Sequence, residues 1–287
     1  MIQPQVGAPI DMVADPTWQL AFGILHFAIA GLVVAYAAKT PIKEKNWNEL
    51  LFRMMVLLGA TLSAYFFEAA IDRAGQLWYA EIGAWPMSDF WGVRVPLWVA
   101  PVYTWFLGGG ALILIHAVRT GAPRNFYYKV FLGIVIADLL LEVPIILMGG
   151  LYAYWGDTQP FFHELYFPVP AWYLFVNRFF DFFPAMMVLL VMSSGKKWAV
   201  WTIPFVMIAG AYGSYALTTW PVIIALQNDG SIIMTHIGGA LTIGLALLGT
   251  YICVISAPKL QHAMDWMNQD KTESKSKKIS SSLAMTD

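Results

Sequence analysis

Charged residues are scarce in this sequence: they make up 12% of its 287 residues, and 59% are hydrophobic. A soluble domain carries about 25% charged residues, so this chain has too few to cover the surface of a soluble globule. The same composition excludes a disordered chain. The net charge of −1 offers no basic surface for nucleic acid. With one cysteine, Cys253, an internal disulfide and a cysteine-rich metal site are also excluded.

Long apolar segments dominate what remains. A membrane core about 30 Å thick is crossed by roughly 20 apolar residues in a helix. Seven segments qualify, at about 17–38, 50–72, 96–117, 130–152, 171–193, 198–220 and 232–256. We therefore predict an all-α integral membrane protein, with a seven-helix transmembrane domain at 1–257 and a disordered Lys/Ser-rich cytoplasmic tail at 258–287. The long aromatic loops 74–95 and 153–170 are expected to form a cap.

The positions of Lys and Arg predict the orientation. Fourteen of them fall in the segments that join spans one to two, three to four and five to six, or in the tail, and two fall on the opposite side. Positive residues stay preferentially on the cytoplasmic side. The N-terminus is therefore predicted to face outward and the C-terminus the cytoplasm, in a plasma or bacterial inner membrane.

Ionisable and polar side chains inside the predicted spans are the main functional signal, because each costs several kcal/mol unless it is paired or hydrated. They are Glu68 and Asp72 in span two, Asp138 and Glu142 in span four, Asn177, Arg178 and Asp181 in span five, His26 in span one and His236 in span seven. Residues four apart share a helix face, and the helical rise places most of these groups in the outer half of the membrane. This predicts one polar cavity that opens outward.

Two further features of the spans favour a proton-handling cavity. Pro144, just after Glu142, removes a helix hydrogen bond and frees a carbonyl, as happens in helices that line cavities. Leaving Asp72 aside, four buried acids face one buried Arg, so at least one carboxyl is expected to be uncharged or linked to water. Arg178 with Asp181, or with Glu142, is equally consistent with a structural ion pair.

Several known chemistries lack their residues here. The last span has no Lys for a retinal Schiff base, and no zinc-binding, phosphate-binding or dinucleotide-binding motif is present. We expect neither a metal nor a cofactor.

One stretch carries a resemblance. It runs from Glu142-Val143-Pro144 through Met148-Gly149, Tyr152, Tyr154 and Gly156 to Gln159-Pro160-Phe161. It resembles a stretch in a group of uncharacterised polytopic bacterial membrane proteins, a likeness that implies no function. The architecture as a whole is similar to that of the seven-helix membrane cyclases of isoprenoid and meroterpenoid pathways, which implies buried carboxylic acids that protonate an alkene or epoxide.

The favoured hypothesis is a cofactor-independent membrane enzyme, a cyclase or isomerase of an apolar, isoprenoid or sterol-like lipid. A protonated carboxylic acid would start the reaction, and aromatic faces would stabilise the carbocation. The expected acid is Glu142, with Asp138, Glu68 and Asp181 as further catalytic candidates. Residues expected to bind or orient the substrate are Arg178, Asn177, His26, His236 and Asp72.

Two other functional classes, a transporter and an accessory subunit, are also consistent with the sequence. A proton-coupled transporter would use the same carboxyls to bind a proton or a cation, although the chain lacks the repeats common in carriers. An accessory membrane subunit would use the ion pairs to hold its helices together and its outer loops to dock a partner. The sequence predicts membrane lipids as neighbours and does not define an oligomeric state.

Overall fold

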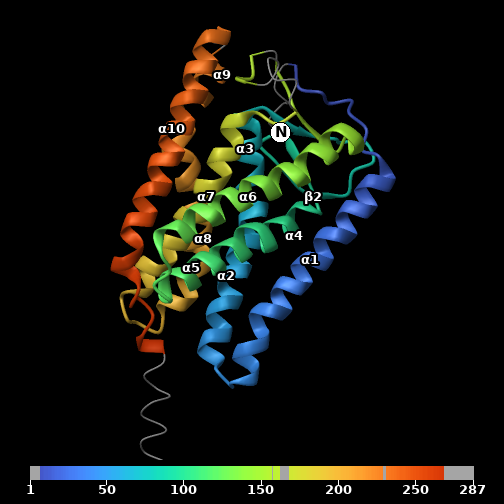
Figure 1. Ribbon diagram of the computed structural model, residues 1–287. Coiled ribbons are helices and arrows are strands. Elements are labelled where there is room, and N and C mark those ends of the chain that lie inside the picture. The colour runs from blue at the N-terminus through green and yellow to red at the C-terminus, as the bar shows by residue number, and fades with distance from the viewer. Residues whose placement is uncertain (1–6, 157, 162–167, 229–230, 268–287) are drawn as a thin grey trace, which may run out of the picture.

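The computed structural model describes residues 7–156, 158–161, 168–228 and 231–267 (Figure 1). In these ranges seven helical segments are long and apolar enough to cross a membrane, which confirms the predicted number of candidate spans. The spans are α1 (Pro16–Lys43), α2 (Trp47–Phe66), α4 (Val99–Tyr103) continued by α5 (Gly109–Arg119), α6 (Arg124–Pro144), α7 (Ala171–Met192), α8 (Ala199–Thr218) and α10 (Ile232–Ser256). Two short helices complete the set, α3 (Glu68–Gly75) and α9 (Trp220–Gln227).

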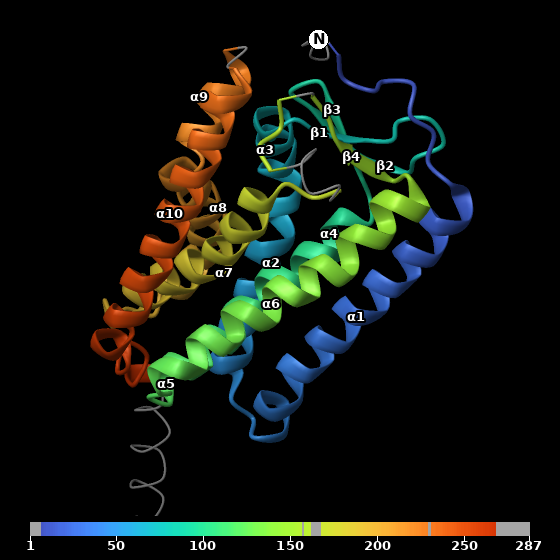
Figure 2. The ribbon, with the colours of Figure 1, turned by 45° about the horizontal axis from the view of Figure 1, so that its top comes forward.

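Four short strands gather at one end of the bundle, which we call the strand-bearing end (Figure 2). They are β1 (Leu77–Tyr79), β2 (Pro86–Phe90), β3 (Val93–Pro96) and β4 (Tyr152–Tyr154). β1 pairs with β4 and β2 with β3, each antiparallel. The all-α prediction therefore holds for the bundle but not for this end, where half of the residues 74–95 fold as strands.

The second predicted span, 50–72, is divided in the structure. α2 ends at Phe66, and α3 begins at Glu68 after a break at Phe67, whose φ of −109° departs from helical geometry. The apolar run before the break and the acidic residues after it thus belong to different helices. As a result, Glu68 and Asp72 lie outside the seven candidate spans, although both are buried.

The fourth predicted span, 130–152, ends earlier than expected. Pro144 cannot donate a backbone hydrogen bond, and the helix widens after it into a π-helical turn, Ile145–Gly149. Gly150 then reverses the chain at a φ of +55°, a conformation that glycine adopts without steric cost. The residues that follow form β4 instead of a last helical turn. A second π-helical turn, Thr104–Gly108, joins α4 to α5.

The sixth predicted span, 198–220, ends two residues early. α8 stops at Thr218, and Trp220 begins the separate helix α9 with Pro221 in its first turn. Proline is well tolerated there because the first backbone N–H groups of a helix have no intrahelical partner. The Trp-Pro pair therefore ends one helix and starts another.

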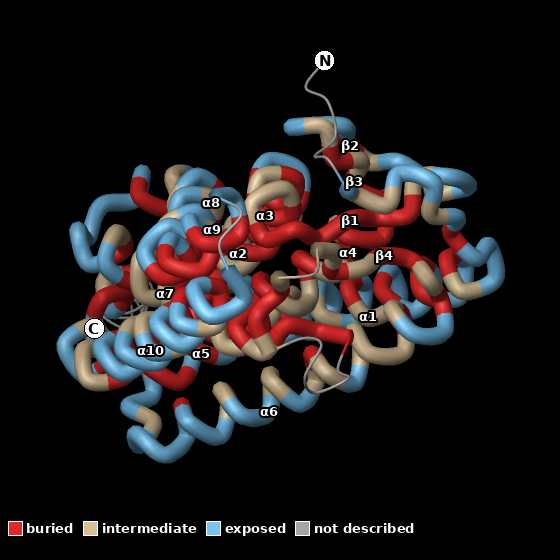
Figure 3. The backbone as a smooth tube through the Cα atoms, turned by 90° about the horizontal axis from the view of Figure 1, so that it is seen from above, coloured by how far each residue is buried: buried red, intermediate tan, exposed pale blue. Residues whose placement is uncertain are grey.

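The spans differ in how deeply they are buried (Figure 3). In the most apolar window of α7, 61% of residues are buried, whereas the figure for α6 is 11%. Close packing between other spans depends on small residues: a Cβ at Gly108 would lie 2.9 Å from Leu57 Cδ2 and 3.1 Å from Ala60 Cβ. α7 therefore forms the centre of the bundle, and α6 lies at its edge with a largely apolar, uncovered face.

The stretch 142–161, which carries the resemblance, continues beyond β4 and contacts helices that are far apart in the sequence. The Gln159 side-chain amide donates to the Gly75 carbonyl oxygen at 2.8 Å. Pro160 lies so close to α10 that a Cβ at Gly239 would approach it to 3.0 Å. This half of the stretch thus joins the end of α3 to α10 and has a structural role.

The chain after α10 packs back onto the bundle. Met264 and Met267 are buried, and the Trp266 indole N–H donates to the Met192 carbonyl oxygen at 2.9 Å. The predicted tail thus starts with an attached segment, and its remainder, 268–287, lies outside the described residues.

A buried ion cluster joins three helices at the end opposite the strands. Glu49 of α2 accepts hydrogen bonds from Arg53 Nε at 2.9 Å and from Arg119 Nη1 of α5 at 2.9 Å and 3.1 Å. Arg53 also donates to the Ala37 carbonyl oxygen of α1 at 3.1 Å. Glu49 is 7% exposed, so it offsets two guanidinium charges that are themselves only partly in contact with water.

Glu49→Ala is expected to lower the free energy of unfolding by about 2–3 kcal/mol, because both arginines lose their buried acceptor. Unfolding in mixed micelles would measure this. The exposed Asp265, which pairs with His262, provides the control: Asp265→Ala is expected to leave stability unchanged. Equal stability of the two variants would show that the Glu49 cluster does not hold the three helices together.

Candidate functional site

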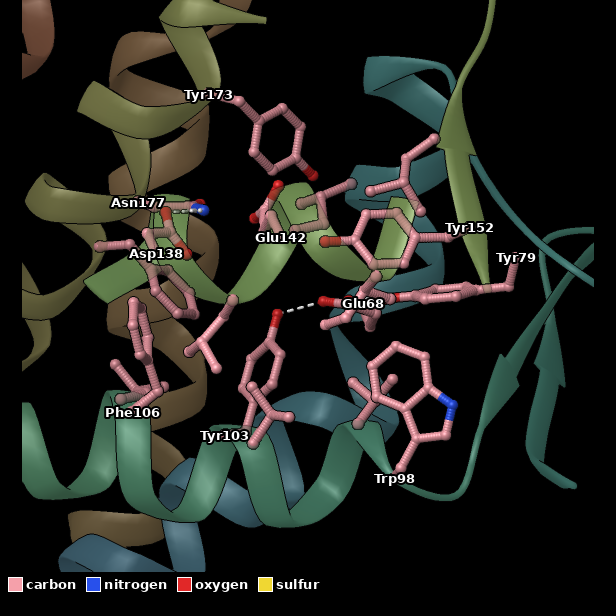
Figure 4. A pocket seen from close by; sticks show the side chains of 18 of the residues that line it. Glu68, Tyr79, Trp98, Tyr103, Phe106, Asp138, Glu142, Tyr152, Tyr173 and Asn177 are labelled. Carbon is pink, nitrogen blue, oxygen red and sulfur yellow. Dashed lines mark hydrogen bonds between the residues drawn. The ribbon is translucent and has the colours of Figure 1, made fainter. Parts of the chain in front are cut away.

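A cavity of about 100 Å³ lies inside the bundle near the strand-bearing end (Figure 4). Its walls come from α1, α3, β1, α4 with the π-helical turn after it, α6, β4, α7 and α8. Three carboxyl groups line it, those of Glu68, Asp138 and Glu142. Most of the remaining lining is aromatic, including Trp98 and Phe180. The cavity thus combines acids with an aromatic wall.

The β1–β4 pairing places tyrosines over this cavity. Tyr79 is opposite Tyr152, and Leu77 is opposite Tyr154. Alternate residues of a strand point to the same face, and these four side chains all line the cavity while Trp78 does not. The small sheet is therefore the wall that supplies phenol groups to the acids.

Glu68 is held by two of the phenols. Tyr79 donates to Oε1 at 2.5 Å, and the hydroxyl of Tyr103, from α4, donates to Oε2. Burial raises the pKa of Glu68, and the two phenol hydrogen bonds oppose that shift. Burial, followed by the nearby Glu68 charge, raises the pKa of Tyr79, so this phenol remains a donor. Glu68 is thus arranged as a hydrogen-bond acceptor.

Asp138 and Glu142 form the second acidic group, on α6. Asp138 accepts from Arg178 Nη2 at 2.9 Å and from the Asn177 amide at 3.2 Å. Glu142 accepts from the Tyr154 hydroxyl at 3.0 Å and lies one helical turn beyond Asp138, on the same face of α6. Two carboxyls this close to each other in the interior of a protein resist being ionised together. Because two donors already stabilise the Asp138 carboxylate, Glu142 is the candidate for the protonated member.

Arg178 balances this group from α7. Its side chain is fully buried, 2.9 Å from Asp138 Oδ2 and 3.5 Å from Asp181 Oδ2. Its guanidinium carbon lies 4.7 Å from the centre of the Phe106 ring, which lines the cavity. The arginine therefore pairs with Asp138 and Asp181, whereas the sequence left open a pairing with Glu142.

Asn177 connects the acids to a neighbouring helix. Its amide donates to Asp138, and its Oδ1 accepts from the hydroxyl of Tyr215 on α8. Both side chains line the cavity. Asn177 thus orients the Asp138 carboxylate, whereas the sequence places it among the residues expected to bind or orient the substrate.

Two predicted acids lie outside the cavity lining. Asp181 is fully buried beside Arg178, and Asp72 is fully buried on α3. Neither carboxylate oxygen of Asp72 has a hydrogen-bond partner among the described residues. Burial, then the charges of Glu68 and Glu142, raise the pKa of Asp72 well above its usual value. Asp72 is therefore a neutral buried acid that adjoins the site.

Asp72→Asn is expected to stabilise the protein increasingly as the pH rises. The raised pKa means that the folded state holds a proton which the unfolded state releases above about pH 4. Wild type therefore loses up to about 1.4 kcal/mol per pH unit relative to the variant, until the pH passes the folded pKa. Thermal unfolding in detergent at pH 4, 6 and 8 would measure the growing difference. Parallel pH profiles for the two proteins would contradict it, and Asp89→Asn, at an exposed site, is the control.

The two predicted histidines occupy different places. His26, on α1, is buried and lines the cavity, where its Nδ1 accepts from the Trp105 indole N–H at 2.8 Å. His236, on α10, lies away from the cavity with its ring centre 4.9 Å from that of Phe161. The structure thus gathers Glu68, Asp138, Glu142, Asn177 and His26 around one cavity, with Arg178 directly behind, and leaves His236 apart.

The tyrosine hydroxyls are the part of the site that sequence reasoning missed. The sequence singles out Tyr152 and Tyr154 only as members of the resembling stretch, and it singles out neither Tyr79 nor Tyr103. The available signal is the alternation in Leu-Trp-Tyr and Tyr-Ala-Tyr, which is typical of strands with one face toward an interior.

Among the described residues, no three His, Cys, Asp or Glu side chains are placed to hold a metal ion. No family model, curated protein or solved structure matches the chain.

Proposed function

We propose that this protein is a membrane-embedded enzyme that cyclises or isomerises an apolar, isoprenoid or sterol-like lipid by acid catalysis. The observation that supports this is the placement of three carboxyl groups, two of them hydrogen-bonded by phenols, in one aromatic cavity. A general acid needs its proton and a dry site, and a carbocation needs aromatic faces and nearby negative charge.

In the proposed cycle Glu142 is the acid. Its carboxyl proton is transferred to an alkene carbon, which forms a C–H bond, leaves a carbocation and makes Glu142 a carboxylate. The cation rearranges or closes a ring against Trp98 and Phe180, then loses a proton to Glu68. Transfer of that proton back to Glu142 restores the enzyme, so the substrate isomerises with no net gain or loss of atoms.

The supporting residues have separate tasks in this proposal. Asp138 remains ionised through Arg178 and Asn177 and stabilises the cation by its charge. Asp181 is a positioning residue, because it contacts Arg178 and not the cavity. The reaction requires no cofactor.

The size of the cavity limits what it encloses. An apolar cavity of about 150 Å³ accommodates benzene, so about 100 Å³ fits roughly one five-carbon isoprene unit. We propose that the reacting end of the lipid enters the cavity and that the rest of the molecule stays in the bilayer.

The proposed orientation places the strand-bearing end and the N-terminus outside, with the C-terminus in the cytoplasm. Lys and Arg concentrate in the connections at the opposite end, between α1 and α2, α5 and α6, and α7 and α8. This bias supports that orientation in a plasma or bacterial inner membrane. The active cavity would then lie in the outer half of the bilayer.

Mass spectrometry of lipid extracts tests the function. Cells that make isoprenoid lipids would express wild type or Glu142→Gln at matched membrane levels. A lipid found only with wild type would support the proposal, and its mass would identify the substrate class. Identical extracts across hosts of different isoprenoid content would contradict it.

A further inference from the structure

His26 has one ring nitrogen with a fixed partner. The side chain is fully buried, with its ring 3.9 Å from that of Phe22 and stacked at 5.7 Å on that of Trp105, measured between ring centres. The Trp105 indole N–H donates to His26 Nδ1 at 2.8 Å. An indole nitrogen can only donate, so Nδ1 must be the unprotonated nitrogen. Nε2 therefore carries the ring proton, and the imidazole is neutral.

The proton on Nε2 has no acceptor. Nε2 is buried and without a hydrogen-bond partner among the described residues, and its side chain lines the cavity. The cavity acids do not fill the role: Glu68 binds two phenols, Asp138 binds Arg178 and Asn177, and Glu142 binds Tyr154. A buried donor without an acceptor costs about 1–3 kcal/mol. The site thus offers an unused hydrogen-bond donor.

The charges around the cavity indicate what kind of group can accept a hydrogen bond from His26 Nε2–H. Three carboxyl groups line it, and Arg178, the nearby cation, is already paired with Asp138 and Asp181. An anionic group such as a diphosphate would meet these acids without a free cation to offset them. A neutral oxygen can accept from Nε2–H without adding charge.

We propose that His26 Nε2–H binds an uncharged oxygen, a hydroxyl or carbonyl, at the reacting end of the lipid. This inference rests on the proposed function for calling that lipid a substrate. It narrows the substrate class from any isoprenoid to one with a neutral oxygen within an isoprene unit of the reacting carbon. Trp105 is the positioning residue that fixes the tautomer.

Nitrogen-15 NMR of the full chain, labelled at histidine and held in nanodiscs, tests this directly. His26→Phe, which retains a ring, assigns the His26 signals. The probes are prenol and 2-methyl-2-pentene, which have the same shape but differ in a hydroxyl group. We expect the Nε2–H tautomer, a shift of its signal with prenol, and about tenfold tighter binding of prenol than of the hydrocarbon.

Two variants separate this proposal from the proposed function. Glu142→Gln lacks the catalytic acid and is expected to retain the prenol shift, so the binding site can stand even if no product is found. Trp105→Phe removes the indole donor and is expected to mix the two tautomers and weaken the prenol effect. A proton on Nδ1 in wild type, or equal effects of the two probes, would overturn the assignment.

Discussion

Glu142→Gln is expected to lower the rate of product formation by about 10²–10⁴-fold, the usual contribution of a general acid. Glutamine has nearly the same shape, and its amide oxygen can still accept from Tyr154, so the fold is expected to persist. Its amide group cannot transfer a proton to an alkene. The rate would be measured in purified membranes with the lipid that the extract comparison identifies.

Companion variants separate the roles of the cavity acids. Glu68→Gln retains Glu142 as the acid but removes the carboxylate that binds two phenols, so it is expected to slow the release of the second proton and to change the ratio of products. Glu81→Gln, outside the cavity lining, is the matched control and is expected to leave the rate unchanged. Full activity in Glu142→Gln would assign the acid to another carboxyl.

The sequence predicts the spans because they depend on a local property. Twenty consecutive apolar residues satisfy the membrane core by themselves, so the seven segments could be located without knowing their neighbours. The ends of these segments depend on single residues, and one such residue can affect a helix in more than one way. Pro144 could kink a helix or end it, and here a π-helical turn and Gly150 end it.

Only the charged residues of the site could be predicted from the sequence. An acid within an apolar segment stands out because it is costly there, so the sequence alone indicates Glu68, Asp138 and Glu142. The partners of these acids follow from tertiary packing. Tyr103 reaches Glu68 from 35 positions away in the sequence, and the phenols of β1 and β4 meet because these strands, separated by more than seventy residues, pair. No local pattern encodes that pairing.

Arg178→Met is expected to lower the free energy of unfolding by about 3–5 kcal/mol, the largest stability effect that we anticipate in this chain. The side chain is fully buried, and its removal leaves Asp138 and Asp181 without the charge that lies 2.9 Å and 3.5 Å from them. Methionine fills a similar space, so the lost free energy of unfolding comes from unpaired charge more than from a void. Denaturant unfolding in micelles would measure it, with the exposed Lys129→Met as a control that is expected to be neutral.

A double variant distinguishes charge from packing at this position. If the cost of Arg178→Met comes from a stranded Asp138 carboxylate, adding Asp138→Asn should recover at least half of the lost stability, because the neutral amide needs no cation. A pair that matters only for packing would instead show no recovery when Asp138→Asn is added. Recovery would also support Glu142 as the protonated acid, since it would mean that Asp138 is the ionised carboxyl on this face of α6.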